Sequence, residues 1–244
     1  MKKIIISFVL LSFCFVLSSC KERTLDDIMK DGKIIVATNA EFPPFEYLDG
    51  DTITGFDIDL IKLYAKYLGV DIEINNIDFD GALLSVSSNK ADLVIAGVTK
   101  NEKREQSLSF SNGYFSASQV VIVKKNSNIS GTTIEEIRES LSQNNATIGA
   151  QAGTVGEYYA KGDSDWDFEI IPNTICQTYD NGALAIKALN NGQIDAVIID
   201  KLPAIELTKS YSELQILDTT LTEEEYAICL LYTSPSPRDR TRSR

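Results

Sequence analysis

Two charged side chains stand where buried strands are expected to end. Arg104 lies just beyond the apolar run ADLVIAG (91–97), and Asp200 closes the run IDAVIID (194–200). A planar guanidinium binds a carboxylate through two parallel N–H donors, and a carboxylate suits an ammonium group. Together they would bind the head group of an amino acid. Each has a plainer interpretation alone: a solvated surface arginine, and an N-cap for a helix beginning near Leu202.

Other polar and aromatic groups follow strands in the same way. Thr99 offers a hydroxyl, and the turn 153–156 (GTVG) offers backbone N–H groups that can hold an anion, although such a turn alone is more often a loop. Phe42 lies in AEFPPFEY (40–47), directly after the apolar run KIIVAT (33–38). Because prolines fix φ and stop both helix and ladder, a rigid loop is expected to hold this ring at the strand's end.

The elements that position these residues alternate between strand and helix. After KIIVAT, a helix is expected from Asp57, as its N-cap, to Gly69. The strand VDIEIN (70–75), a helix over 81–88 and the strand ADLVIAG follow. This alternation predicts a parallel sheet with helices on its faces.

A second set of elements follows the long strand-like run SASQVVIVKK (116–125). Its segment GQIDAVIID (192–200) aligns without gaps on NKADLVIAG (89–97), which indicates two similar α/β lobes, although so short a match can arise by chance. Ligands in open α/β sheets bind beyond the carboxyl ends of strands. Four candidate residues fall at such ends: Phe42, Thr99, Gly153 and Asp200. The sequence therefore predicts two lobes that face each other across a ligand cleft.

Composition excludes several kinds of chemistry. The chain has no histidine, which excludes Ser-His and Cys-His catalysis and imidazole zinc sites. Its four cysteines (14, 20, 176 and 229) form neither a disulfide framework nor a metal-binding spacing. A net charge of −12 argues against a nucleic-acid partner. We expect no catalytic residues, no metal and no cofactor.

The first twenty residues have the pattern of an export signal. Two lysines precede an apolar stretch over 4–17, which is shorter than the roughly 20 residues of a membrane span. LSSC (17–20) resembles the lipobox of bacterial lipoproteins, so residues 1–19 are expected to be removed and Cys20 to carry lipid. An ordinary cleaved signal with a chance cysteine is the plainer alternative.

The last residues do not match the rest of the chain. Residues 230–244 (LLYTSPSPRDRTRSR) carry four arginines and serine-proline repeats at the end of an acidic protein. A disordered tail is one interpretation. We prefer another, because the stretch resembles translated sequencing-adapter read-through. Residues 229–244 are therefore expected to be a non-native tail that leaves the first lobe incomplete.

From about Gly32 to Ile228 the chain resembles the amino-acid-binding members of the bacterial solute-binding proteins, which have a type II periplasmic-binding fold. The resembling stretches, in family order, are AEFPPFEY, GFDIDL, FDGALLSV, KADLVIAGVT with EKR, FSNGYFSAS, GAQAGTVGE and GQIDAVIID. The resemblance implies an α/β fold of two lobes, each a mainly parallel sheet flanked by helices. The expected divisions are a linker over 20–31, lobe 1 over 32–118, lobe 2 over 119–223 and a return to lobe 1 over 224–228.

The resemblance also implies a ligand pocket. Its residues would be Phe42, Phe79, Ala96, Gly97, Thr99, Arg104, Thr154 and Asp200. The two rings would stack on the ligand side chain, Arg104 and Thr154 would hold the α-carboxylate, and Asp200 would bind the α-amino group. The other three would line the pocket.

Several positions depart from the family pattern. Val155 stands where many members have threonine, Lys100 and Asn101 replace the usual Ile-Thr, and Asn112 replaces an aspartate. Asn39 lies where some binders of basic amino acids have aspartate, which weakly disfavours a cationic ligand side chain. The head-group residues themselves are present.

By this resemblance the protein is an extracytoplasmic lipoprotein, expected to be a monomer. It would capture a free polar amino acid and deliver it to the membrane permease of an ABC importer, closing by a hinge motion. Its lipid would anchor it to the bilayer.

Two alternatives share the fold. A cyclohexadienyl-dehydratase-like enzyme would need a positioned acid or base, for which the candidates are Glu41, Glu46, Glu157 and Asp200. A receptor-kinase sensor domain would need a transmembrane helix downstream.

The tail yields the first testable prediction. Resequencing the source locus should show native DNA that diverges from the printed sequence near Cys229, since serine-proline repeats and arginines bury almost no apolar surface. The idea is wrong if that DNA encodes TSPSPRDRTRSR in frame followed by a stop codon.

Overall fold

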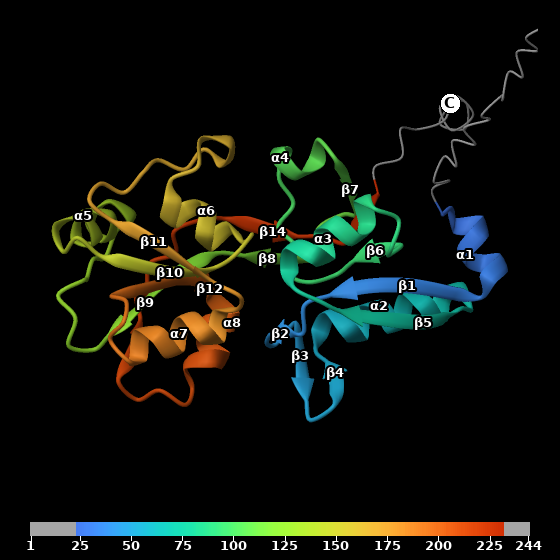
Figure 1. The fold of residues 1–244 in the computed structure, drawn as a ribbon, viewed down its shortest axis with the longest axis horizontal. Helices are drawn as coiled ribbons and strands as arrows, with labels where there is room; N and C mark the ends of the chain where they lie inside the picture. Colours follow the sequence, from blue (N-terminus) through green and yellow to red (C-terminus); the bar gives the residue numbers. More distant parts are fainter. Residues whose placement is uncertain (1–22, 232–244) are drawn as a thin grey trace, which may run out of the picture.

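Strands and helices alternate along the chain to build two lobes that lie side by side in the computed structural model, which describes residues 23–231 (Figure 1). The expected signal segment, Cys20 and most of the expected tail lie outside the described residues. Each lobe has a five-stranded sheet at its centre.

Lobe 1 contains the first half of the chain and its last described strand. Its sheet has the order β5 (Asp71–Asn76), β1 (Lys33–Thr38), β6 (Leu93–Val94), β15 (Cys229–Leu231) and β7 (Leu108–Phe110). Only β15 runs against the other four strands. The helices are α1 (Leu25–Asp31), α2 (Phe56–Leu68), α3 (Phe79–Ser87) and α4 (Glu102–Glu105). A small antiparallel sheet is formed by β2 (Glu41–Phe42), β3 (Glu46–Asp49) and β4 (Thr52–Thr54).

Lobe 2 repeats this plan. Its sheet has the order β11 (Ile175–Tyr179), β10 (Thr147–Gln151), β12 (Ala196–Asp200), β9 (Gln119–Lys124) and β13 (Leu214–Ile216), with only β9 reversed. The helices are α5 (Ile134–Gln143), α6 (Val155–Lys161), the short 3₁₀ helix η1 (Ser164–Trp166), α7 (Gly182–Asn190) and α8 (Lys201–Thr208). The mixed, mainly parallel sheets flanked by helices confirm the expected fold class.

The continuous apolar runs of the central strands are explained by burial on both faces of the sheet. Successive side chains of a strand point to opposite faces. In β9, Val120 and Ile122 pack with α7, whereas Val121 and Val123 pack with α5 and α6. A strand covered on one face only would alternate with polar residues.

Two antiparallel strands join the lobes. They are β8 (Phe115–Ala117) and β14 (Glu224–Tyr226), which lie between the two sheets (Figure 1). Beside them, the Ala227 N–H donates to the Val98 carbonyl at 3.0 Å and the Lys100 N–H donates to the Glu225 carbonyl at 2.9 Å. The strand β14 is thereby bonded to the segment that follows β6, at the edge of the cleft.

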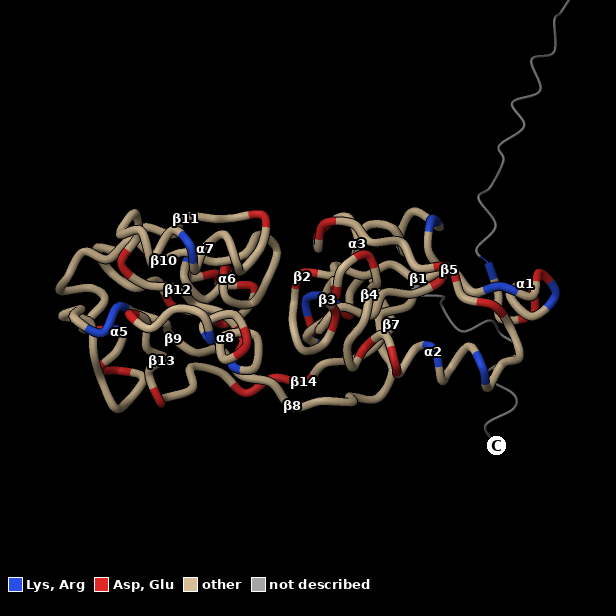
Figure 2. Tube along the Cα trace, turned by 90° about the horizontal axis from the view of Figure 1, so that it is seen from below, with Lys and Arg blue, Asp and Glu red and all other residues tan. Residues whose placement is uncertain are grey.

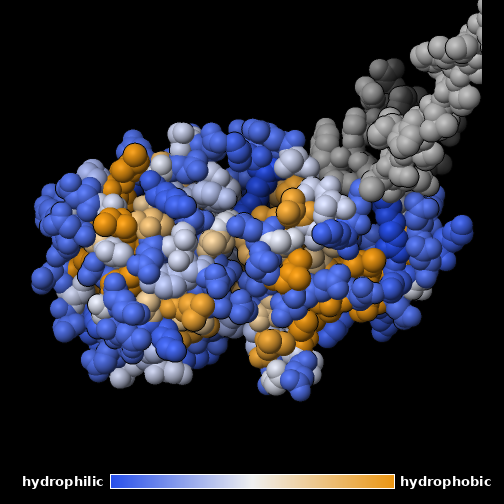
Figure 3. Space-filling model, viewed as in Figure 1, coloured by the Kyte–Doolittle hydropathy of each residue, from blue (hydrophilic) through white to orange (hydrophobic). Residues whose placement is uncertain are grey.

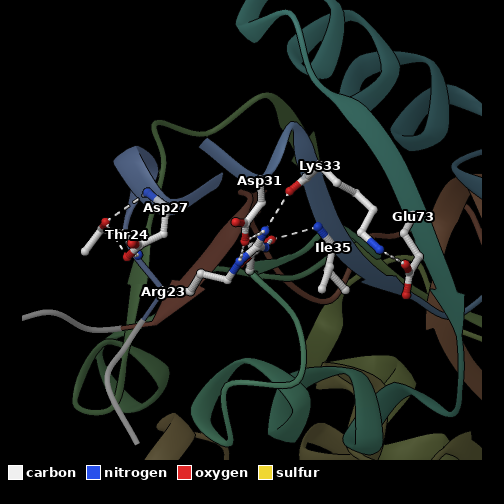
Figure 4. A network of polar contacts seen from close by, with 8 residues as sticks. Arg23, Thr24, Asp27, Asp31, Lys33, Ile35 and Glu73 are labelled. Atoms are coloured by element: carbon white, nitrogen blue, oxygen red, sulfur yellow. Dashed lines mark hydrogen bonds and ion pairs between the residues drawn. The ribbon is translucent and has the colours of Figure 1, made fainter. Parts of the chain in front are cut away.

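The first described residues are bonded to the lobe 1 sheet (Figure 4). Arg23 forms ion pairs with Asp31 and Asp92, and it donates to the Lys33 carbonyl at 2.9 Å. Thr24 forms a capping box for α1. These bonds fix α1 against the start of β1.

Three local expectations were wrong. Gly55, not Asp57, is the N-cap of α2; its φ is +124°, and a Cβ there would lie 2.2 Å from the Phe45 carbonyl oxygen. Asp57 is instead buried within the first turn. Phe42 lies in the short strand β2 rather than in a loop, and the run 116–125 is divided at Ser118 into β8 and β9.

The expected tail was placed to begin near Cys229. The structure pairs residues 229–231 as β15 with both β6 and β7, and the Cys229 side chain is fully buried in the lobe 1 core. The expected tail therefore overlaps a strand of the lobe 1 sheet. Its remaining residues, 232–244, lie outside the described range, so the tail stays a prediction.

Asp and Glu residues are spread over both lobes (Figure 2). Hydrophobic side chains reach the surface of lobe 1 in the region of α2, where Phe56, Leu63 and Tyr67 are exposed (Figure 3). Within the described part of the chain, no helix has the length and apolar character needed to cross a membrane.

Candidate functional site

All eight pocket residues expected from the sequence line one cavity between the lobes, with an empty volume of about 320 Å³. The structure adds four more lining residues: Asn39, Glu46, Gln151 and Val155. This volume includes space that is open to solvent. The arrangement places the eight residues together, while their roles in binding stay predictions.

Arg104 is a buried cation without an anionic partner in the described chain. It lies in α4, which Asn101 caps, and it is 8% exposed. Its Nη1 donates to the Thr99 carbonyl at 2.8 Å and its Nη2 to the Gly153 carbonyl at 3.1 Å. A guanidinium has five N–H donors. Donors and full charge therefore remain available to a carboxylate in the cavity.

Asp200 is a buried carboxylate without a cationic partner among residues 23–231. It is the N-cap residue of α8, but its side chain makes no capping bond. The hydroxyl of Tyr226, which is 1% exposed, donates to Oδ1 at 2.5 Å instead. Burial and the nearby Glu224 carboxylate raise the pKa of Asp200 to about 7 against the effect of the Tyr226 bond. A ligand ammonium would supply the missing positive charge.

Two further buried carboxyl groups, those of Glu46 and Asp57, lie together beside the cavity. Glu46 lines the cavity and is fully buried. In the described chain, no hydroxyl, amide or basic group forms a hydrogen bond with either of its carboxyl oxygens. Burial raises its pKa well above the usual value, and the neighbouring Asp57 carboxyl and Asp200 raise it further. Asp57 accepts from the Gly97 N–H at 2.9 Å and from the Tyr114 hydroxyl at 2.8 Å. We interpret Glu46 as a protonated donor to Asp57.

The two phenyl rings approach the cavity from lobe 1. Phe42 packs so closely on Gly97 that a Cβ at Gly97 would lie 2.9 Å from the ring. Phe79, at the start of α3, has its ring centre 5.5 Å from the Arg104 guanidinium carbon. Phe79 is therefore a neighbour of the cation as well as a wall of the cavity.

Further polar contacts cross the cleft between the two lobes. The Gln151 amide donates to Asn39 at 3.0 Å and the Asn181 amide to Glu41 at 3.0 Å. The Gln151 Oε1 atom is buried and has no partner in the described chain. The lobes are thus in contact around the cavity.

The expected anion-binding turn is corrected in part. The Gly153 N–H donates to Glu157 at 2.6 Å, so this donor is not free for a ligand. The Thr154 hydroxyl lines the cavity but donates to the Gln151 carbonyl at 2.8 Å. Thr99 likewise donates to Glu224 at 2.6 Å. Their hydroxyl oxygens can still accept a hydrogen bond.

Sequence reasoning missed Gln151 and Tyr226. Gln151 ends an apolar strand just as Asp200 does, and that position was the available signal. No sequence signal identifies Tyr226, because its role depends on a bond between two strands 26 residues apart. In the described residues, no three His, Cys, Asp or Glu side chains gather in a way that could hold a metal ion.

Comparison with known proteins identifies the family. The model of the bacterial extracellular solute-binding proteins, family 3, matches residues 34–185. The chain belongs to this family. The resemblance seen in the sequence is confirmed.

A sequence relative and two solved structures are similar to this chain along most of its length. The arginine-binding extracellular protein ArtP of Bacillus subtilis is 30% identical over 217 residues, covering 88% of this chain and 79% of that protein. The L-arginine-bound structure of AbpA, an amino acid ABC transporter substrate-binding protein of Streptococcus pneumoniae, has a TM-score of 0.74 at 33% identity, covering 88% and 90% of the two chains. The ancestral amino-acid-binding protein AncCDT-1, a precursor of cyclohexadienyl dehydratase, has a TM-score of 0.75 at 31% identity, covering 86% and 87%.

The raised pKa of Asp200 predicts opposite pH effects on the free protein and on binding. Because this pKa lies above that of the unfolded carboxyl, protonation stabilises the folded state, and that stabilisation is lost as pH rises through about 7. An ammonium ligand needs the ionised form. Lowering the pH from 8 to 6 should therefore raise the Tm of the free protein and weaken amino-acid binding about tenfold.

Calorimetry and thermal unfolding across this pH range check the prediction. Asp200→Asn should remove most of the pH dependence of binding, and Tyr226→Phe should shift its midpoint upward because the ionised carboxylate loses a donor. Tyr179→Phe is the matched control, since its hydroxyl has no partner in the described chain. Constant affinity from pH 6 to 8 would contradict the assignment.

Proposed function

We propose that this solute-binding protein captures a free L-α-amino acid between its lobes and delivers it to the permease of an ABC importer. One observation carries the proposal. A buried guanidinium and a buried carboxylate line the same cavity, and neither forms an ion pair with a side chain of the described chain. Unpaired buried charges are costly. An α-carboxylate on Arg104 and an α-ammonium on Asp200 would pair both at once.

The contacts across the cleft support capture by closure. The hydrogen bond from Gln151 to Asn39 is one of the contacts that hold the lobes together beside the cavity. In the described residues, the chain itself passes between the lobes at the two strands β8 and β14. Two extended crossings of this kind permit a hinge motion. In the proposal, the ligand binds between open lobes and stabilises the closed arrangement, which the permease then receives.

The ligand side chain is proposed to be polar and to carry hydrogen-bond donors. The Oε1 atom of Gln151 is a buried acceptor without a partner in the described chain. The Glu46 carboxyl also lines the cavity and offers further oxygen atoms to a ligand. L-Arginine and L-glutamine are the first two candidates. A similar ancestral arginine-binding protein is bound to glutamine in its solved structure, at 33% identity and a TM-score of 0.72. Asn39 in place of an aspartate favours the neutral side chain.

Export and anchoring are part of the proposal. The family is extracellular by description, and the signal-like residues 1–19 with LSSC support an extracytoplasmic protein anchored through lipid on Cys20. We propose that it acts as a monomer.

An enzyme is the second candidate function. Carboxyl groups with raised pKa values in a cleft are typical of active sites, and Asp200 and Glu46 meet that description. Of the other two candidate acids or bases, Glu157 is bonded to the Gly153 N–H and paired with Lys161, and Glu41 accepts from Asn181. Turnover of prephenate or arogenate would support an enzyme, and its absence a binding protein.

A thermal-shift screen of the twenty amino acids tests the proposed function most directly. A ligand that binds only the folded state raises Tm in proportion to the logarithm of its concentration over Kd. One or a few amino acids should raise Tm strongly at millimolar concentration. A flat response to all twenty would refute the proposed function.

Arg104→Ala is expected to weaken binding of the amino acid found in that screen by about 30-fold to several-thousand-fold, since a buried charge loses its partner. Arg104→Lys keeps the charge but loses the bidentate geometry and should fall between. Calorimetry showing less than a threefold change for Arg104→Ala would refute the carboxylate assignment. Asp200→Asn should cause a comparable loss, except for a ligand that lacks the α-amine.

The two rings should differ in their effects. Phe42→Ala should weaken arginine or glutamine by about 2- to 10-fold and affect glycine and alanine less, because only long or flat side chains present area to a ring. Phe79→Ala should weaken all of them, since this ring also contacts Arg104. Equal losses for every ligand in Phe42→Ala would mean that Phe42 only supports the core.

A further inference from the structure

A short segment of lobe 2 lies against Arg104 from the far side of the cleft. This segment is the 3₁₀ helix η1, and two of its consecutive residues meet two consecutive residues of α4. Asp165 forms an ion pair with Lys103. The ring centre of Trp166 lies 5.0 Å from the guanidinium carbon of Arg104.

The Trp166 ring is itself stacked on another aromatic ring. Tyr158 of α6 stacks on it with ring centres 4.6 Å apart and an interplanar angle of 16°. Trp166 is half-buried and does not itself line the cavity that contains Arg104. Its ring therefore acts on the cation and not on a ligand in that cavity.

Because the neighbour of Arg104 is an aromatic ring and not a carboxylate, Arg104 keeps its charge. The face of an indole attracts a cation and accepts little from its N–H donors. A carboxylate in the same place would neutralise Arg104 and occupy its donors. The rings of Phe79 in lobe 1 and Trp166 in lobe 2 thus stabilise a desolvated cation while leaving it free to pair with a ligand.

We propose that Trp166 is a positioning residue for Arg104, supplied by lobe 2, that completes the carboxylate-binding end of the cleft when the lobes close. The inference rests on the proposed function, because it takes the α-carboxylate as the group that Arg104 binds. It adds a residue outside the cavity whose contact with Arg104 depends on closure.

Affinity of matched variants tests the proposal. L-Arginine and L-glutamine are measured by calorimetry, and argininamide and glutaminamide, which lack the α-carboxylate, by competition. Trp166→Leu should weaken the two amino acids about 3- to 30-fold and reduce the preference for acid over amide by a similar factor. Trp166→Phe keeps an aromatic face and should stay within about threefold of the unchanged protein.

Lys103→Gln is the matched control, because it breaks the adjacent contact between the same two segments. It should weaken acid and amide ligands equally, by a small factor, as for an exposed ion pair. The proposal is overturned if Trp166→Leu also weakens acids and amides equally, or if Trp166→Phe is no better than Trp166→Leu.

Fluorescence provides a second measurement, since Trp166 is the single tryptophan of the chain. Saturation with L-arginine or L-glutamine should change its emission, and binding without any change would overturn the proposal. If neither amino acid binds, the proposed function fails for these ligands. The contact between Trp166 and Arg104 is then tested by measuring Trp166 emission in the ligand-free Arg104→Leu variant. Emission that equals that of the unchanged protein would overturn the proposal.

Discussion

A buried guanidinium without an anion is the constraint on which the site depends. Arg104 is 8% exposed, and its two recorded bonds go to carbonyls of Thr99 in one lobe and Gly153 in the other. Carbonyl dipoles and aromatic faces lower the cost of burial without cancelling the charge. Asp200 is a buried acidic group in the corresponding position. Burial and the Glu224 carboxylate oppose its ionisation, and no cation in the described chain favours it.

The strand β14 connects these two ends to the joint between the lobes. Tyr226 donates to Asp200, which belongs to lobe 2, while Glu224 accepts from Thr99 of lobe 1 at 2.6 Å and from Gln119 at 3.1 Å. Glu224 also raises the pKa of Asp200. A change in the charge of Asp200 therefore alters its interactions with Tyr226 and Glu224 of β14, the strand that crosses between the lobes. In the proposed function, closure of the lobes and binding of the head group would be coupled through these shared residues.

The sequence was informative where the pattern is local, and it failed where the role of a residue depends on partners distant in the chain. Apolar runs and their carboxyl ends located the sheets, and the family motifs located eight of the twelve residues that line the cavity. Asp57 was taken for a cap because caps favour aspartate at a helix start. Its buried bonds to Gly97 and Tyr114 join segments 40 and 57 residues away. Trp166 gave no signal for the same reason, since its contact with Arg104 exists only between lobes.

The carboxyl groups around the cavity explain why ligand and stability should be linked. Burial raises the pKa values of Glu46, Asp57 and Asp200, so ionising any of these groups costs the folded protein stability. A site arranged in this way is less stable when empty, which favours opening of the lobes. In the proposed function, a ligand ammonium would compensate the negative charge of Asp200, and the ligand carboxylate would compensate the charge of Arg104. In the proposed function, pairing these charges would supply free energy for closing the cleft, and a ligand that lacks either charge would leave one of them unpaired.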